Sequence, residues 1–298
     1  MVKRFFSLDA SEIENLNSRE LLESIKSSEG RIVLSECIVA FQPPIYGLTN
    51  AEVAKAFGAD LILLNIFDVD RPFIFNLGEG KDVVKRLKEL VSRPIGVNLE
   101  PVDNSANMME ERLEISSGRT ATRENLAKLD EYGFDFVCFT GNPSTGVSNN
   151  AILDAIRIAK SEFSGLIIAG KMHASGVDEP IVDIKSIEQF IEAGADIILV
   201  PSVGTVPGVT DEDIREVVRL AHKKDTLVMA TIGTSQESAS RETIREIALR
   251  NKINGVDIHH IGDAGIGGVA LAENIYELGV TIRGTRHTIH QMAASIKR

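Results

Sequence analysis

The sequence predicts an α/β fold, a (β/α)8 TIM barrel with an extra N-terminal helix and a C-terminal helical tail. Short apolar runs rich in β-favouring residues alternate with amphipathic segments of helical period. One phrase recurs before four of these runs, and polar residues gather where the runs end. An open, doubly wound sheet is the alternative that the same alternation allows.

Eight apolar runs are expected to form parallel strands buried on both faces. They are residues 31–39, 61–68, 94–101, 136–143, 166–174, 197–204, 227–234 and 256–263. Each is followed by a segment with the apolar spacing of a helix that packs on a sheet, as in KDVVKRLKELV and DEDIREVVRLAHKK. Thr49 with Glu52 forms a capping-box pattern, and Thr210 with Asp213 approximates one.

The recurring phrase reads AFGADLILLN, YGFDFVCFTG, EAGADIILVPS and, more loosely, INGVDIHHIG. Its glycine suits the left-handed position after a helix, and an aspartate precedes the strand. We therefore divide the chain into an N-terminal helical extension (1–30), the barrel (31–279) and a basic helical tail (280–298). The two terminal segments are not needed to form the barrel and could contact another subunit, so we expect a homo-oligomer.

Composition limits the class of partner. The chain has 298 residues, 43% hydrophobic and 25% charged, with a net charge of −11, which argues against nucleic acid as a partner. No apolar run approaches the roughly 20 residues that span a bilayer, and the N-terminus lacks a secretory apolar core. Cys37 and Cys138 lie in apolar runs and are interpreted as buried core residues. These features predict a cytoplasmic protein without a membrane or nucleic-acid partner.

Polar residues mark the carboxyl ends of the predicted strands, where barrels of this class carry their active sites. In chain order they are Glu36, Asn65, Asp68, Asp70, Asn98, Glu100, Thr140, Asn142, Lys171, His173, Ser202, Thr205, Thr231, Thr234, Ser235, His259, His260 and Asp263. So many polar groups would be costly inside a buried strand without partners. We predict a common polar cavity, with Asn65, Asn98 and His260 as substrate-binding residues.

Two glycine-bearing loops follow the last two strands, where such barrels often bind phosphate. We expect an anion at Gly233, Thr234 and Ser235, and at Gly262, Gly265, Gly267 and Gly268. The alternative is that the glycines only permit tight turns and close packing. Asp263 would repel an anion unless its carboxylate points away.

Lys171 and His173 are two residues apart on one predicted strand and so share a face. We predict them as catalytic, Lys171 for a carbonyl or an anion and His173 for proton transfer, with Glu36 and Glu100 as acid, base or metal ligands. Lys171 could instead only neutralise Glu100 or Glu36. His259 and His260 point to opposite faces, so at most one reaches the cavity.

A magnesium ion is the cofactor that the carboxylates allow. Glu36, Asp68, Asp70 and Glu100 come from three neighbouring predicted strands, and hard cations prefer oxygen ligands. We assign Asp68 and Asp70 as the candidate metal ligands, with simple solvation of both side chains as the alternative. No organic cofactor is expected, because the glycine spacing does not match a dinucleotide-binding fingerprint.

The run LSECIVAFQPPIYGLTNAEVAKAFGADLILLNIFDVDRPF, with the tail RGTRHTIHQMA, resembles a bacterial family of uncharacterised barrels labelled PEP phosphonomutase-like. A fainter similarity to the BtpA group is carried by ADLILLN, PIGVNLEP, GKMHAS and ILVPSVGT. PEP mutases and isocitrate lyases would imply a Mg²⁺-dependent reaction on a small phosphorylated or carboxylated acid. Those enzymes carry an aspartate pair on strand three and a glutamate on strand four, whereas this chain has Asn98, Glu100 and the run FTGNP there.

We therefore expect an enzyme that acts on a small phosphorylated or carboxylated metabolite by lyase, mutase or isomerase chemistry at a C–C or C–P bond. Its partner would be a small anionic metabolite. A barrel without catalysis, serving as a metabolite sensor or assembly factor, is the second hypothesis. A metal-dependent hydrolase is the third.

Overall fold

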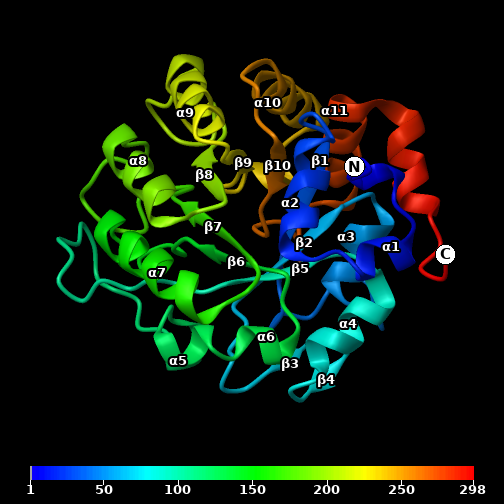
Figure 1. Ribbon diagram of the computed structural model, residues 1–298, viewed down its shortest axis with the longest axis horizontal. Helices are drawn as coiled ribbons and strands as arrows, with labels where there is room; N and C mark the ends of the chain where they lie inside the picture. The colour runs from blue at the N-terminus through cyan, green and yellow to red at the C-terminus, as the bar shows by residue number, and fades with distance from the viewer. Residues whose placement is uncertain (1) are drawn as a thin grey trace.

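The computed structural model describes residues 2–298 and confirms the barrel. Eight parallel strands close in the order β1, β10, β9, β8, β7, β6, β5 and β2 (Figure 1). They are β1 (Ile32–Ile38), β2 (Leu61–Asn65), β5 (Ile95–Asn98), β6 (Phe136–Phe139), β7 (Leu166–Gly170), β8 (Ile197–Pro201), β9 (Leu227–Ile232) and β10 (Ile258–Ile261). The open sheet is thereby excluded.

Helices surround the barrel on its outer side. They are α3 (Asn50–Ala56), α4 (Val83–Val91), α5 (Arg123–Leu126), α6 (Leu129–Tyr132), α7 (Asn149–Glu162), α8 (Ile184–Ala193), α9 (Asp211–Lys223), α10 (Arg241–Ile253) and α11 (Ala272–Ala293). The capping boxes expected at Thr49 and Thr210 are both formed. A two-stranded hairpin of β3 (Phe73–Ile74) and β4 (Gly78–Glu79) and the 3-10 turns η2 (Ser117–Arg119) and η3 (Gln236–Ser238) lie in loops.

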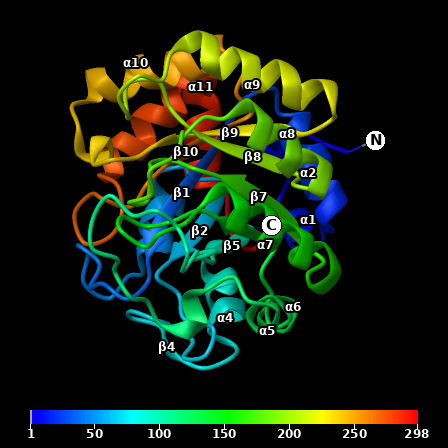
Figure 2. The same ribbon diagram turned by 90° about the vertical axis from the view of Figure 1, so that its left-hand side faces the viewer.

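The extra helices close one end of the barrel. The N-terminal segment forms η1 (Phe5–Ser7), α1 (Ala10–Glu14) and α2 (Ser18–Lys26). Leu21 and Ile25 of α2 pack into the same apolar cluster as the inward-facing side chains Leu34 and Leu63. Figure 2 shows α1 and α2 at one end of the barrel and the long loops at the other. Among the described residues, the cavity therefore opens at the loop end, where the strands terminate.

The C-terminal tail continues the last barrel helix. α11 bends at Gly284, which has φ 77° and ψ 163°, and then runs to Ala293. Arg283, just before the bend, is buried and donates to the carboxylate of Asp60 and to the carbonyl of Gly58. This part of the tail is therefore held against the start of β2.

The aspartate of the recurring phrase bonds neighbouring strands together. In each copy its Oδ2 accepts a hydrogen bond from a backbone N–H near the start of the preceding strand. The pairs are Asp60 with Val33 at 2.8 Å, Asp135 with Ile95 at 2.7 Å, Asp196 with Ile167 at 2.8 Å and Asp257 with Val228 at 2.8 Å. The phrase recurs in every second strand because one aspartate serves each pair of strands.

The barrel interior changes from apolar to polar along the strands. Leu34, Leu63 and Met229 lie in the apolar interior cluster. Two residues further along each strand, on the same face, stand Glu36, Asn65 and Thr231, and all three are buried. Asn98 of β5, His260 of β10 and Thr140, which directly follows β6, are further buried polar residues near the ends of their strands. This polar layer forms the floor of the open end.

One glycine in the interior is required by a neighbouring ring. An added Cβ at Gly96 would lie 2.1 Å from ring atoms of Phe136 on the adjacent strand. We expect Gly96→Ala to lower the free energy of unfolding by about 1–3 kcal/mol, as overpacking typically does. Urea unfolding measures the loss, and Gly96→Ala combined with Phe136→Leu should recover part of it. If the double variant recovers nothing, the ring is not the cause.

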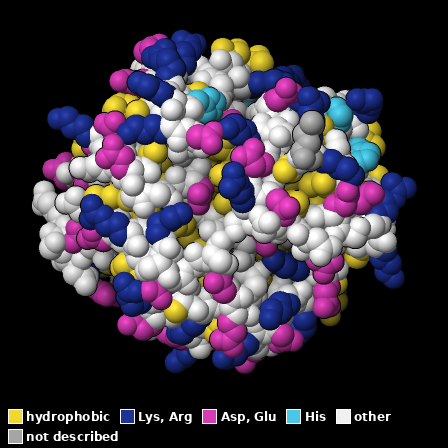
Figure 3. Space-filling model, viewed as in Figure 1, with side chains coloured by type: hydrophobic (Ala, Val, Ile, Leu, Met, Phe, Trp, Pro, Cys, Tyr) yellow, Lys and Arg dark blue, Asp and Glu magenta, His cyan; other side chains and the backbone are white. Residues whose placement is uncertain are grey.

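The outer surface is of mixed charge on the side that Figure 3 shows. Side chains of Lys and Arg are interspersed there with those of Asp and Glu, so that side carries no continuous basic surface. Within residues 2–298, no helix has both the length and the apolarity needed to cross a membrane.

Candidate active site

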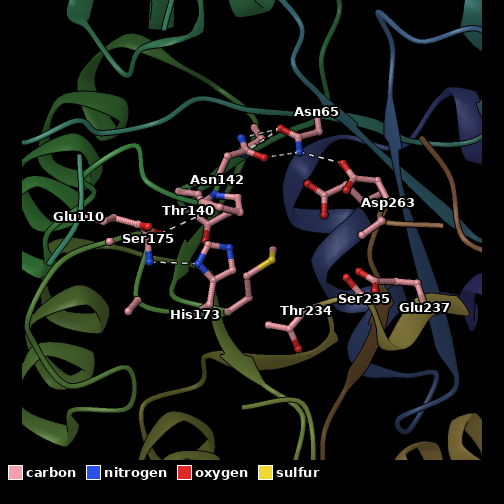
Figure 4. A pocket seen from close by; sticks show the side chains of 18 of the residues that line it. Asn65, Glu110, Thr140, Asn142, His173, Ser175, Thr234, Ser235, Glu237 and Asp263 are labelled. Atoms are coloured by element: carbon pink, nitrogen blue, oxygen red, sulfur yellow. Dashed lines mark hydrogen bonds between the residues drawn. The ribbon is translucent and has the colours of Figure 1, made fainter. Parts of the chain in front are cut away.

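A cavity of about 640 Å³ opens above the polar layer (Figure 4). Its walls come from strand ends and from the loops that follow them. The lining residues are Glu36, Asn65, Asn98, Met109, Glu110, Thr140, Gly141, Asn142, Pro143, Met172, His173, Ala174, Ser175, Gly176, Thr234, Ser235, Glu237, Asp263 and Ala264. Asn65, Asn98, Glu36, His173, Thr234 and Ser235 are thus brought together, as the sequence predicts for a common polar cavity.

The loop after β5 covers one side of the cavity. Its Met109 N–H donates to the carbonyl of Gly176 at 2.8 Å, and its Leu113 N–H donates to that of Ser144 at 2.8 Å. These bonds tie it to the loops after β6 and β7. The same loop brings Met109 and Glu110 to the rim, with the Glu110 carboxylate accepting from Ser144 Oγ at 2.7 Å.

Glu36 and His260 form a buried pair in the floor. Glu36 Oε2 lies 3.2 Å from His260 Nε2, and both side chains are almost fully buried. Burial, with the nearby charges of Glu237 and Glu100, raises the pKa of Glu36 to about 8. Burial lowers the pKa of His260 to about 4. Near neutral pH the pair therefore consists of a protonated carboxyl group and a neutral imidazole.

The inner histidine is now identified. His260 packs against Glu36 beneath the cavity lining, so it supports the floor and does not line it. His259 points outward, and its Nε2 lies 3.1 Å from the carbonyl of Gly30.

Two more carboxyl groups stand beside Glu36. Burial, together with the charge of Glu36, raises the pKa of Asp263 to about 7, although a hydrogen bond from Asn65 Nδ2 at 2.8 Å opposes the shift. Burial also raises the pKa of Glu237, and Asp263 adds to that shift. Glu36, Glu237 and Asp263, which we call the carboxyl cluster, thus keep their protons to a higher pH than isolated carboxylic acids do.

An amide network connects the cluster to the opposite wall. Asn65 Nδ2 donates to Asn142 Oδ1 at 2.8 Å, and Asn98 Nδ2 donates to Asn65 Oδ1 at 3.2 Å. Glu100 accepts from the Asn142 backbone N–H and from its Nδ2, both at 2.8 Å, and from Arg119 at 2.6 Å. Glu100 lies outside the cavity lining, so the structure makes it a residue that positions Asn142.

His173 faces Asp263 and Glu237 across the cavity (Figure 4). Its Nδ1 accepts a hydrogen bond from the backbone N–H of Ser175 at 3.0 Å. Burial lowers the pKa of His173, and the charge of Lys171 adds to this effect while that of Glu100 opposes it. The neutral ring then carries its proton on Nε2, which makes it a hydrogen-bond donor.

Lys171 departs from the expected arrangement. β7 ends at Gly170, where an added Cβ would lie 2.0 Å from the carbonyl oxygen of Leu199. Lys171 and His173 therefore lie in a loop and do not share the face of a strand. The Lys171 ammonium group pairs with Glu179, outside the cavity lining. Neither Glu36 nor Glu100 is its partner.

The candidate metal ligands also lie elsewhere. Asp68 Oδ1 accepts from the backbone N–H groups of Asp70 at 2.8 Å and Arg71 at 3.2 Å. Asp70 pairs with Lys128 at 2.6 Å. β2 ends at Asn65, so both aspartates belong to the following loop and not to the strand. Within residues 2–298, no three His, Cys, Asp or Glu side chains come together as metal ligands, so Glu36, Asp68, Asp70 and Glu100 do not fit the Mg²⁺ that we expected them to hold.

Close packing accounts for most of the glycines after β10. Added Cβ atoms would lie 2.9 Å from Pro44 at Gly267, 2.8 Å from Ile38 at Gly268 and 2.1 Å from the Val269 carbonyl oxygen at Gly265. Gly262, Gly265, Gly267 and Gly268, like Gly233, lie outside the cavity lining. Of the residues expected to bind phosphate, only Thr234 and Ser235 line it.

Sequence reasoning missed Glu237 and Glu110. Glu237 reaches the cavity because Thr234 and Ser235 have φ values of 56° and 73° and turn the chain into η3. Left-handed backbone at two successive non-glycine residues is rare and is a frequent feature of functional sites. No sequence pattern predicts this left-handed turn. Glu110 is placed by the long loop after β5, whose path depends on contacts with other loops.

Known structures share the fold. The chain superposes on 2,3-dimethylmalate lyase, a PEP mutase/isocitrate lyase superfamily member, with a TM-score of 0.53 and 13% identity, over 87% of this chain and 83% of that chain. An archaeal fructose 1,6-bisphosphate aldolase gives a TM-score of 0.54 and 12% identity, over 87% and 96%. Oxaloacetate acetylhydrolase in complex with its product oxalate gives 0.52 and 13%, over 84% and 81%.

At these identities the similarity establishes the fold. The first of these structures agrees with the resemblance to PEP phosphonomutase-like barrels, whereas similarity to the BtpA group is not shown. A search of curated protein sequences finds no match. The family model described as "Domain of unknown function (DUF7916)" matches residues 6–298, and the chain belongs to that family.

Proposed function

We propose that the protein is a lyase-type enzyme that moves protons on a small polar substrate held in the cavity. The carrying observation is that Glu36, with a pKa of about 8, lies in the cavity wall beside Asp263, with a pKa of about 7. Two carboxyl groups whose pKa values lie at and just above neutral pH are suited to act as base and acid. Known lyases with this fold support the reaction class.

The groups present fit cleavage of a C–C bond between a hydroxyl-bearing carbon and a carbon next to a carbonyl group. Asp263 as carboxylate takes the hydroxyl proton, a new carbonyl group forms, and the C–C bond breaks towards the existing carbonyl. His173 Nε2–H donates to the oxygen on which negative charge develops. Glu36 then delivers its proton to the carbon of the resulting enolate, which completes the reaction.

No step in this scheme uses Lys171 or a metal ion. A Schiff base at Lys171 would require the ammonium group to leave Glu179 and enter the cavity. The expected phosphorylated or carboxylated substrate finds no Lys or Arg among the described residues that line the cavity.

We expect His173→Ala to slow the reaction by about 10²-fold or more, because it removes the donor to the developing oxyanion. The measurement is loss of C–H signal next to the carbonyl in D₂O, by NMR, across a panel of hydroxyketones, keto acids and aminoketones. His290→Ala, an exposed histidine on α11, is the matched control and should leave the rate unchanged. Absence of exchange with every compound would favour the non-catalytic barrel instead.

A further inference from the structure

The charge of the cavity lining indicates which substrates it can accept. Four carboxyl groups, those of Glu36, Glu110, Glu237 and Asp263, line the cavity. The described lining residues include no Lys or Arg, and the lining histidine, His173, is held neutral by burial. A phosphate or carboxylate would find no cationic partner in this wall and would be repelled by each carboxyl group that is deprotonated, whereas a cation would be attracted to those groups.

Two cationic side chains just outside the lining do not change this balance. Arg119 is bonded to Glu100 at 2.6 Å, and Lys171 is paired with Glu179. Both guanidinium and ammonium groups are thus neutralised outside the lining. Negative charge that develops on the carboxyl cluster as it loses protons is opposed by no Lys or Arg in the lining, within residues 2–298.

Among the buried lining oxygens without a hydrogen-bond partner in the described chain, which include Thr140 Oγ1, two belong to a carboxyl and an amide group. They are Glu237 Oε2 and Asn98 Oδ1, on side chains that are 2% and 3% exposed. The Asn98 amide is oriented by its bond to Asn65, which leaves the carbonyl oxygen as the free group. An ammonium group offers three donors and no acceptor, and so complements such a surface.

The placement of Glu237 is also specific. An added Cβ at Gly262 would lie 2.3 Å from Glu237 Oε1, so only glycine leaves room for this carboxyl group. The residue is delivered by the left-handed turn at Thr234 and Ser235. The chemistry proposed above gives Glu237 no task.

We propose that Glu237 is a specificity-determining residue that binds an ammonium group of the substrate, so that the enzyme acts on an amine-bearing metabolite. This inference rests on the proposed function, because it concerns the same site. Its test is independent, because binding can be observed without turnover. The ammonium group lies against Glu237 while Glu36 and Asp263 remain free to transfer protons. A substrate that carries only phosphate or carboxylate groups is disfavoured.

The binding of an amine should strengthen as pH rises. The charges of Asp263 and His260 act on Glu237. Glu36 also lies close to Glu237, and the charge of Glu100 acts on Glu36 in turn. Burial raises the pKa of Glu237, so its carboxyl group keeps its proton to a higher pH than an isolated one does, and the neighbouring Asp263 has a pKa of about 7. A cation binds the deprotonated form, and an aliphatic amine stays charged in this range, so affinity increases from pH 6 to pH 8.

The test is a thermal-shift and calorimetric titration of the full chain with ethanolamine, serinol and putrescine. Phosphate, pyruvate, malonate and Mg²⁺ alone are titrated in parallel. The variant Glu237→Gln keeps the shape and removes the charge, and Glu216→Gln, an exposed residue on α9, is the control. We expect at least one amine to bind, more tightly at pH 8 than at pH 6, and about tenfold or more weakly to Glu237→Gln, which is a change of about 1.4 kcal/mol.

Binding of the anions but of no amine would overturn the inference, as would equal amine binding by Glu237→Gln. Binding of Mg²⁺ alone, lost in the same variant, would also overturn it and would make the carboxyl cluster a cation site. Amine binding without hydrogen exchange on any substrate would leave the inference standing and refute the proposed function. Hydrogen exchange on keto acids without binding of any amine would support the proposed function and refute this inference.

Discussion

A Glu36→Gln variant is expected to be more stable than the wild-type protein above pH 8 and to lose its catalytic activity. The Glu36 carboxyl group has a folded-state pKa of about 8, against an ordinary value of 4.5. A raised carboxyl pKa means that the folded state holds the proton more tightly than the unfolded state. The wild-type protein therefore loses stability as pH rises from about 4.5 to about 8.

Glutamine has the shape of the protonated acid and does not titrate. The difference in unfolding free energy between variant and wild type should be small at pH 5 and reach roughly 3–5 kcal/mol at pH 9, because one pKa unit corresponds to about 1.4 kcal/mol. Urea unfolding at the two pH values measures it. Activity should fall by about 10²–10⁴-fold at every pH, since the variant cannot deliver a proton.

Glu100→Gln is the matched control for this experiment. Glu100 is as buried as Glu36, but its carboxylate accepts bonds from Arg119 and Asn142. Its replacement removes a partnered charge and should destabilise the protein at both pH values. If Glu36→Gln is also destabilising at pH 9, the Glu36 carboxyl group is compensated in the folded protein and cannot be the acid of the reaction.

The contrast between the two glutamates bears on function. A carboxyl group that lowers the stability of the folded protein near its working pH contributes nothing to holding the barrel together. Such groups are typical of sites where stability is exchanged for activity. Glu36 fits this description, and Glu100, with its cation and two amide donors, does not.

The fold was predictable because the signals that specify it are local. Each strand is a short apolar run, and each copy of the recurring phrase marks the start of a second strand in a pair. The inward positions of Glu36 and Asn65 follow from counting two residues on from Leu34 and Leu63 of the apolar interior. The alternation of inward and outward side chains along a strand therefore predicts part of the site as well as the fold.

The other residues of the site depend on where each strand ends and the inward–outward alternation of its side chains stops. Close approach of the Leu199 carbonyl oxygen requires glycine at 170, which ends the strand before Lys171 and sends its ammonium group to Glu179. Glu237 enters through two residues in left-handed conformation. Both outcomes depend on contacts between segments that are distant in sequence. Such contacts cannot be predicted from the pattern of one apolar run.

The recurring aspartate leads to the largest stability effect that we expect outside the site. Asp60 and Arg283 form an ion pair in which both side chains are fully buried, and Asp60 Oδ2 also accepts from the Val33 N–H. Asp60→Ala leaves a buried guanidinium group without its carboxylate and a backbone N–H without its acceptor. We expect a loss of about 3–5 kcal/mol in unfolding free energy, measured by urea unfolding.

Asp257→Ala separates the two contributions. Asp257 makes the same bond to the preceding strand, with Val228 N–H at 2.8 Å, but its ionic partner His222 is 43% exposed at the side chain. Water can solvate that imidazole after the carboxylate is removed, so the loss should be about 1–3 kcal/mol, the cost of an unsatisfied buried group. Arg283→Met combined with Asp60→Ala should recover part of the larger loss, because it removes the stranded charge. Equal losses at Asp60 and Asp257, with no recovery in the double variant, would assign the stability to the bond between strands and leave the buried ion pair without net effect.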